Sequence, residues 1–198
     1  MKFVLATQNP KKLQEMAGIL ANLGVEIVSQ QELGVKVEVE ETGTTFAENA
    51  MLKAQAVMQA TGLPAIADDS GLCVKALNGA PGVYSARYGG EGLDDAGRCR
   101  LLLSNLRGQT DRSADFQTAI ACVFPDGRTL TAEGSCHGAI AFVPMGSEGF
   151  GYDPVFLVPE LRKTFAQLST EEKAGISHRG KALRNFYTQL ENYLEKRA

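Results

Sequence analysis

The chain has 198 residues, 44% of them hydrophobic, which is enough for one compact domain over residues 1–198 with a substantial core. The formal net charge of -3 at pH 7 argues against a nucleic-acid partner, because binding to nucleic-acid backbones needs a cationic surface. The four cysteines form no CxxC pair, the first residues lack the pattern of a secretory leader, and the sequence contains no membrane-length apolar run. We therefore expect a cytoplasmic protein with reduced thiols and no membrane partner.

The N-terminal residues predict a strand, a polar loop, a helix and a second strand. Phe3–Ala6 is apolar, and Asn9 can cap a helix whose first residue is Pro10. Gly24 ends this helix, and Glu26–Ser29 is typical of a second strand.

The next segment predicts a long helix followed by a buried strand. Val35–Val39 alternates with charged residues, which fits either a short edge strand or an extended loop. Thr45 and Glu48 have the spacing of a capping box, so a helix is predicted over Phe46–Thr61. Pro64–Ala67 indicates a strand that ends at the acidic residues that follow it.

The second half predicts a helix, a hairpin and a long final helix. The helix covers Ala96–Leu106, and strands over Phe116–Phe124 and Thr129–Phe142 are joined by a tight turn, which favours antiparallel pairing. Apolar residues at helical spacing over Leu183–Leu194 indicate an amphipathic helix. The predicted fold class is α/β, with a mixed sheet that is parallel early and antiparallel late.

The first chemically suggestive segment is the loop Thr7–Lys12, which leads from the first strand into the first helix. Free backbone N–H groups at the helix start, together with Lys11 and Lys12, favour an anion. An ordinary capped helix with solvated lysines explains the segment equally simply. The GxxxxGK[ST] spacing of a Walker A loop is absent from the sequence.

Two further segments carry acidic residues. Glu40 and Glu41 precede the helix that carries Lys53, an arrangement consistent with magnesium beside phosphate, although acids also favour helix starts for electrostatic reasons. Asp68 and Asp69 at the end of a strand repel each other unless a cation or proton intervenes, which favours a functional site over a simple turn. Such a carboxylate can hold magnesium or accept a proton from an attacking water.

The C-terminal third contains residues suited to a purine base. In Gly149–Phe156 the glycines allow close approach, the rings of Phe150 and Tyr152 can stack, and Asp153 offers acceptors, although such residues also occur in cores and turns. Another group, Lys173 with His178 and Arg179 near a helix start, indicates phosphate or purine recognition. We interpret His137, in an alternating strand, as structural. Arg87 fits either a phosphate contact or a structural tether.

Six ordered motifs together resemble the inosine/xanthosine triphosphate pyrophosphatases, the family of non-standard purine nucleotide pyrophosphatases. The motifs are ATQNPKK, EETGTTFAENAMLKA, AIADDSGLCV, GAPGVYSARY, GFGYDPVF and EEKAGISHRGKAL. The resemblance covers nearly the whole chain. It implies an elongated central sheet with helices on both sides, two lobes that enclose a nucleotide cleft, and a homodimer.

The resemblance also implies roles for individual residues. Asp69 would be the proton acceptor and a ligand of Mg²⁺, and Glu40, Glu41 and Asp68 would be the other candidate metal ligands. Residues expected to contact the substrate are Thr7, Gln8, Asn9, Pro10, Lys11, Lys12, Lys53, Ser70, Phe150, Gly151, Tyr152, Asp153, Lys173, His178 and Arg179. One small departure from the family pattern is Gln8, where many relatives have glycine, and another is Pro10–Lys11, where some have other small or polar residues.

The activity implied is hydrolysis of ITP, dITP and XTP to the monophosphate and pyrophosphate, which would cleanse the nucleotide pool. Two alternatives remain open at this point. One is a regulator that binds purine triphosphates without cutting them. The other is a pyrophosphatase of the septum-inhibitor type that acts on pyrimidine or modified nucleotides, although the GFGYDP and SHRG segments favour the purine enzyme.

Overall fold

The structure of the protein is a computed structural model that describes residues 1–90 and 92–196. They form two compact units. The first unit comprises Met1–Asp69, Thr118–Gly134 and Lys181–Ala198, and the second comprises Ser70–Gln117 and Ser135–Gly180.

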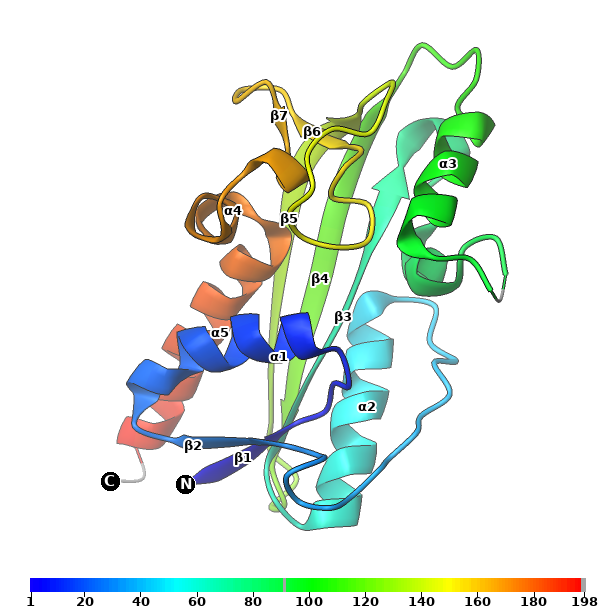
Figure 1. The fold of residues 1–198 in the computed structure, drawn as a ribbon. Coiled ribbons are helices and arrows are strands. Elements are labelled where there is room, and N and C mark those ends of the chain that lie inside the picture. Colours follow the sequence, from blue (N-terminus) through cyan, green and yellow to red (C-terminus); the bar gives the residue numbers. More distant parts are fainter. Residues whose placement is uncertain (91, 197–198) are drawn as a thin grey trace. The chain divides into compact units, whose positions relative to one another are not determined.

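The described strands form one mixed seven-stranded sheet in the order β2-β1-β3-β4-β5-β6-β7 (Figure 1). The strands are β1 Lys2–Leu5, β2 Glu26–Ser29, β3 Ala65–Val74, β4 Ser113–Val123, β5 Thr129–Ile140, β6 Phe156–Val158 and β7 Lys163–Thr164. The helices are α1 Pro10–Leu20, α2 Phe46–Thr61, α3 Asp95–Asn105, α4 Thr170–Ile176 and α5 His178–Glu195. The prediction of a mixed α/β fold is confirmed.

In the first unit, the alternation of side chains along the strands builds two cores. β1 runs parallel to both β2 and β3. Phe3 and Ile66 face one side and pack with α1 and α5, whereas Val4 and Ala67 face the other side and pack with α2. Helices therefore cover both faces of this part of the sheet, as the family resemblance implies.

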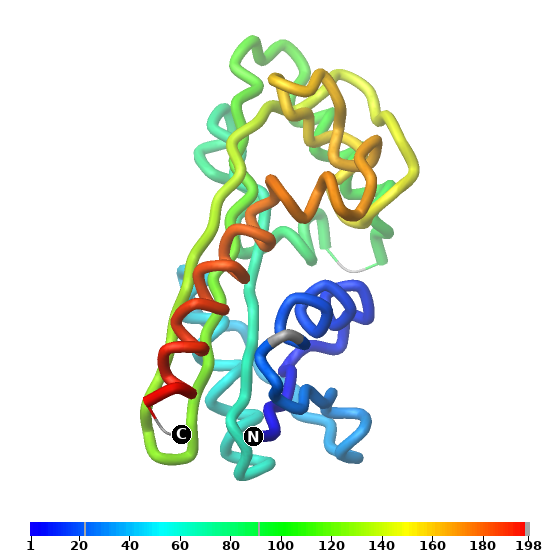
Figure 2. The backbone as a smooth tube through the Cα atoms, turned by 90° about the vertical axis from the view of Figure 1, so that its left-hand side faces the viewer, coloured from blue at the N-terminus to red at the C-terminus, as the bar shows by residue number. Residues whose placement is uncertain are grey.

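The hairpin of β4 and β5 is accompanied by α5 in the first unit, as Figure 2 shows. Two amide side chains of α5 donate to backbone carbonyls of β5: Asn185 to Glu133 at 3.3 Å and Gln189 to Thr131 at 2.9 Å. These bonds complement the apolar face of α5, on which Phe186 is fully buried. The predicted hairpin and final helix are both present.

The second unit has a separate core. Leu72 of β3, Leu102 of α3 and Phe116 of β4 pack there with Phe156 of β6 and Phe165, which follows β7. β5 and β6 pair antiparallel, as do β6 and β7. β6 and β7 are not predicted from the sequence, since strands of 3 and 2 residues carry almost no periodic pattern.

The remaining helix predictions agree closely with the structure. Asn9 caps α1, with Pro10 as its first residue, and α2 has the predicted bounds and capping box. Val35–Val39 is an extended loop, not an edge strand. Among the described helices, none combines the length and apolar character that a membrane span requires.

Candidate active site

The two adjacent aspartates lie inside β3, next to the end of its neighbour β1. β1 pairs with β3 as far as Leu5, which lies opposite Ile66, and β3 then continues through Asp68 and Asp69. The prediction that the aspartates follow the end of their own strand is therefore wrong. β4, the other neighbour of β3, keeps this segment in the sheet, and the strand end beside the aspartates belongs to β1.

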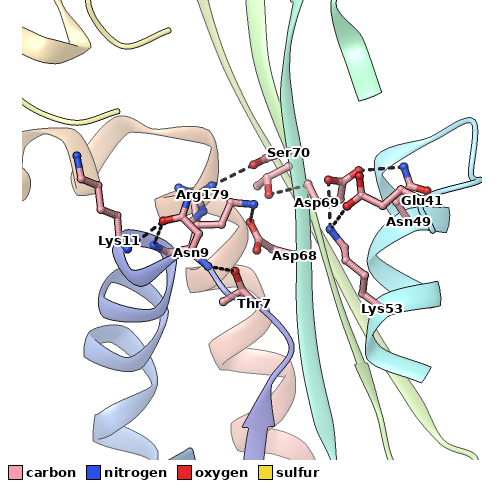
Figure 3. Close-up of polar contacts among 12 residues, drawn as sticks. Thr7, Asn9, Lys11, Glu41, Asn49, Lys53, Asp68, Asp69, Ser70 and Arg179 are labelled. Atoms are coloured by element: carbon pink, nitrogen blue, oxygen red, sulfur yellow. Dashed lines mark hydrogen bonds and ion pairs between the residues drawn. The ribbon is translucent and has the colours of Figure 1, made fainter. Parts of the chain in front are cut away.

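Alternation along β3 sends the two carboxylates to opposite sides of the strand. Asp68 Oδ2 lies 2.9 Å from Lys12 Nζ of α1, and these side chains are 0% and 16% exposed. Asp69 Oδ1 lies 3.4 Å from Lys53 Nζ of α2. Figure 3 shows Asp68 and Asp69 on the two sides of β3. The sequence predicts repulsion between the two carboxylates unless a cation or proton intervenes, and here alternation separates them and each has its own lysine.

Asp69 is held by three residues of the first unit. Its Oδ2 accepts a hydrogen bond of 3.2 Å from Asn49 Nδ2, and its backbone carbonyl accepts one of 3.1 Å from the hydroxyl of Thr118. Its other carboxylate oxygen faces Lys53, whose Nζ also lies 2.7 Å from Glu41 Oε1. Two carboxylates therefore converge on one ammonium group.

Burial and charge shift the pKa values in this cluster. Burial raises the pKa of Asp69 above its ordinary value, an effect that the charge of Lys53 opposes but does not cancel. For Lys53, burial lowers the pKa, but the charges of Asp69 and Asp68 and the hydrogen bond to Glu41 outweigh this effect and raise the pKa. Lys53 is therefore a cation, and Asp69 is a stronger base than an exposed aspartate.

The loop before α1 caps its own helix, so the backbone N–H groups expected to be free for an anion already have an acceptor. Asn9 Oδ1 accepts from the backbone N–H groups of Lys11 and Lys12 at 3.0 and 3.4 Å, and Asn9 N donates to Thr7 Oγ1 at 3.2 Å. Figure 3 shows the side chain of Lys11 pointing away from this cap. Three of the predicted substrate contacts, Gln8, Pro10 and Lys11, are exposed, whereas Lys12 reaches inward to Asp68.

The oxygen ligands near Asp69 are suited to magnesium. Asp69 and Glu41 already share a cation, Lys53 Nζ, whereas Glu40 is exposed. In residues 1–90 and 92–196, no three His, Cys, Asp or Glu side chains gather closely enough to hold a metal. Magnesium typically uses one or two carboxylates, completing its shell with water and substrate phosphates, so this pair fits.

In the second unit, Asp153 contacts two of the other predicted base-binding residues, Phe150 and Lys173. Its Oδ2 lies 2.6 Å from Lys173 Nζ and accepts a hydrogen bond of 2.8 Å from Phe150 N. Lys173 Nζ also lies 4.9 Å from the centroid of the Phe150 ring. A side chain at Gly149 would collide with the carboxylate of Asp153, so this glycine permits the tight loop.

The other predicted base-pocket residues have defined but different surroundings. Arg179 Nη2 donates to Ser70 Oγ at 3.0 Å (Figure 3), and the His178 ring stacks on Phe116 with 4.7 Å between centroids. The ring of Tyr152 belongs to the core, and its hydroxyl donates to Ser85 O at 2.8 Å. The structure therefore gives Tyr152 a packing role rather than an open stacking face.

His137 and Arg87 lie outside these clusters. His137 is an exposed residue of β5 whose Nδ1 lies 3.0 Å from Asp115 Oδ1, which agrees with its interpretation as structural. The guanidinium of Arg87 lies 5.0 Å from the centroid of the Tyr84 ring. The loop that carries Arg87 is also tied through Ser85, whose hydroxyl accepts a hydrogen bond from Leu72 N.

Comparison with known proteins places these features in a family. The family model described as the Ham1 family matches residues 3–189. The chain belongs to the Ham1 family. Among curated relatives, a dITP/XTP pyrophosphatase of Exiguobacterium is 48% identical over 190 residues, which cover 96% of this chain and 97% of the relative. One of Thermus thermophilus, with the same name, is 52% identical over 186 residues, covering 93% and 89%.

A solved Ham1 structure shares the fold. A HAM1 protein from Coxiella burnetii superposes with a TM-score of 0.91 at 45% identity, covering 97% of this chain and 99% of that one. Agreement at this identity supports the same arrangement of elements in this Ham1 family chain. It therefore supports the positions of the six sequence motifs on the strands and helices described above.

Sequence reasoning about this Ham1 family chain missed two polar residues beside the predicted site. Asn49 lies within the ENA part of the second motif, and its contact with Asp69 spans 20 positions. Asp95 at the start of α3 accepts a hydrogen bond of 2.8 Å from Gly151 N. A buried asparagine in a helix is a usable sequence signal, because a buried amide needs partners, whereas Asp95 looks like an ordinary helix-start acid.

Proposed function

We propose that this protein is a dITP/XTP pyrophosphatase that hydrolyses non-standard purine nucleoside triphosphates to the monophosphate and pyrophosphate. The observation that carries the proposal is Asp69, a buried carboxylate with a raised pKa held between Asn49 and Lys53. The similarity to curated enzymes of that name supports the choice of substrate.

The basic residues of the first unit are suited to the triphosphate. The positive end of the α1 dipole attracts negative oxygens, and Lys12 and Lys53 can neutralise charge as it develops on the phosphates. Both lysines are already held by aspartates, so their ammonium groups are positioned before substrate arrives. The role proposed for them is to orient the phosphates and stabilise the transition state.

Asp69 is the proposed proton acceptor. Asp69 orients a water molecule and accepts the proton that this water loses as its oxygen bonds to the α-phosphorus. The bond between the α-phosphorus and the oxygen that bridges it to the β-phosphorus breaks, and pyrophosphate leaves. Asp69 and Glu41 are the proposed holders of Mg²⁺. When bound, Mg²⁺ would supply positive charge to the phosphate oxygens.

The residues of the second unit are suited to a 6-oxopurine. The Lys173 ammonium can donate to the 6-oxo group, and Asp153 offers an acceptor for the ring N1–H. The ring of Phe150, with Lys173 and Arg179 over it, is a surface on which a base can stack. Adenine would leave buried polar groups unmatched at its 6-amino position, which disfavours it.

A nucleotide panel tests the proposal. Pyrophosphate release is measured for ITP, dITP, XTP, ATP, GTP, dUTP and dTTP, with and without magnesium. We expect rapid magnesium-dependent release from the first three. Equal rates on the purine triphosphates would contradict the proposed specificity, binding of ITP without release would favour a regulator, and preference for dUTP or dTTP would favour a pyrimidine enzyme.

We also propose that the protein is a cytoplasmic homodimer, as its resemblance to this family implies. Light scattering during size-exclusion chromatography should give twice the chain mass. A value equal to the chain mass at micromolar concentration would contradict the dimer.

A further inference from the structure

The residue that holds the Asp69 carboxylate is Asn49, a fully buried residue in the first turns of α2. Asn49 contacts Asp69 on one side and the loop before α2 on the other. Both contacts lie within the first unit. Since a buried amide is costly unless its hydrogen bonds are satisfied, this position calls for a polar partner.

The hydrogen bonds fix which way the amide of Asn49 points. Asn49 Oδ1 accepts a hydrogen bond of 2.8 Å from the backbone N–H of Gly43. A backbone N–H can only donate, so the oxygen must face Gly43 and the NH₂ group must face Asp69. The NH₂ group can only donate, and Asp69 Oδ2 accepts from it at 3.2 Å.

The loop before α2 is built to reach this amide. A Cβ atom at Gly43 would lie 2.6 Å from Asn49 Oδ1, so a residue with a side chain would push the loop away. The start of α2 is fixed in turn by the capping box of Thr45 and Glu48. The orientation of the Asn49 amide is therefore set by the backbone N–H of Gly43 and by the fixed start of α2, which carries Asn49.

Asn49 is also the most rigid contact of the Asp69 side chain. Lys53 approaches the other carboxylate oxygen at 3.4 Å, but its long side chain lies closer to Glu41, at 2.7 Å. The hydroxyl of Thr118 binds only the backbone carbonyl of Asp69 and leaves the side chain free to rotate. A short, buried asparagine therefore fixes the position of one carboxylate oxygen, Asp69 Oδ2.

We propose that Asn49 is a positioning residue that holds Asp69 Oδ2. The other oxygen, Oδ1, is thereby presented to the attacking water and to the Mg²⁺ that Asp69 and Glu41 would hold. This inference rests on the proposed function of Asp69. It assigns to Asn49 an effect on the chemical step, and no contact with substrate. Displacing a reacting group by about 1 Å can cost about 10²-fold in rate.

Two variants of Asn49 separate positioning from folding. Asn49→Asp keeps an oxygen for the Gly43 N–H but places a carboxylate against Asp69, where the two repel each other. Asn49→Ala removes both bonds. The matched controls are Gln30→Glu and Gln30→Ala, because Gln30 is also buried and its Oε1 accepts a hydrogen bond of 3.0 Å from the loop residue Val37.

Steady-state kinetics on dITP form the first readout. We expect both Asn49 variants to lose about 10²-fold in kcat, with KM close to that of the unaltered protein, and both Gln30 variants to keep their kcat. A merely structural role would affect the two pairs alike. Asn49→Asp with the kcat of Gln30→Glu would overturn the proposal.

Crystal structures of the unaltered protein and of both Asn49 variants form the second readout, which needs no activity. We expect the Asp69 carboxylate to turn in both variants while the backbone of β3 stays in place. An unchanged Asp69 rotamer in both would overturn the proposal. If the unaltered protein cleaves no nucleotide, the proposed function fails, and the rotamer comparison still decides the role of Asn49.

Discussion

At the scale of single residues, the site depends on two neighbouring acids with different surroundings. Asp68 is fully buried against Lys12, whereas Asp69 faces Lys53 and Asn49. The first is suited to fixing a lysine and the second to accepting a proton. The residue pattern names both acids, and only the family resemblance distinguishes them, because their partners come from helices on opposite sides of the sheet.

The substitution Asp69→Asn tests the role of the second acid. Asparagine has the size of aspartate but cannot accept a proton, so we expect kcat on dITP to fall about 10²- to 10⁴-fold while the nucleotide still binds. Calorimetry and pyrophosphate release measure the two effects. Asp126→Asn, in the exposed turn between β4 and β5, is the control, and an Asp69 variant with near-normal turnover would contradict the assignment.

At the scale of elements, α2 carries both Asn49 and Lys53, so its N-terminal cap supports the site. Thr45→Ala removes the hydrogen bond from Glu48 N to the Thr45 hydroxyl, which should lower the free energy of unfolding by about 1 kcal/mol. Urea unfolding measures the change. The control is Thr42→Ala, an exposed threonine of the preceding loop, and equal losses in both variants would refute the importance of the cap.

The elements that sequence predicts well are those specified by neighbouring residues. The bounds of α2 follow from a capping box and from Gly62, which ends the helix. The course of β3 does not follow in this way, because Asp68 and Asp69 interrupt its apolar pattern while pairing with a distant strand keeps it extended. The site shows the same division: its motifs are visible in the sequence, but the Asn49–Asp69 contact depends on tertiary packing.

At the scale of the whole molecule, the two units share backbone. The elements β3, β4, β5 and α5 each contribute residues to both units. Each unit therefore contains parts of four elements that continue into the other unit. We therefore expect the single domain predicted from sequence to unfold in one transition. Circular dichroism and tyrosine fluorescence should give the same urea midpoint, and two separated midpoints would contradict a single cooperative domain.

The opposite orientations of Asp68 and Asp69 make the site depend on whether a residue is odd or even along β3. Inserting one residue just before Asp68 would exchange the sides, turning Asp68 toward Lys53 of α2 and sending Asp69, the intended base, toward α1. Inserting two would restore both orientations while moving the acids along the strand. Length changes of two residues in this stretch would therefore keep the sides of the two acids but not their lysine partners.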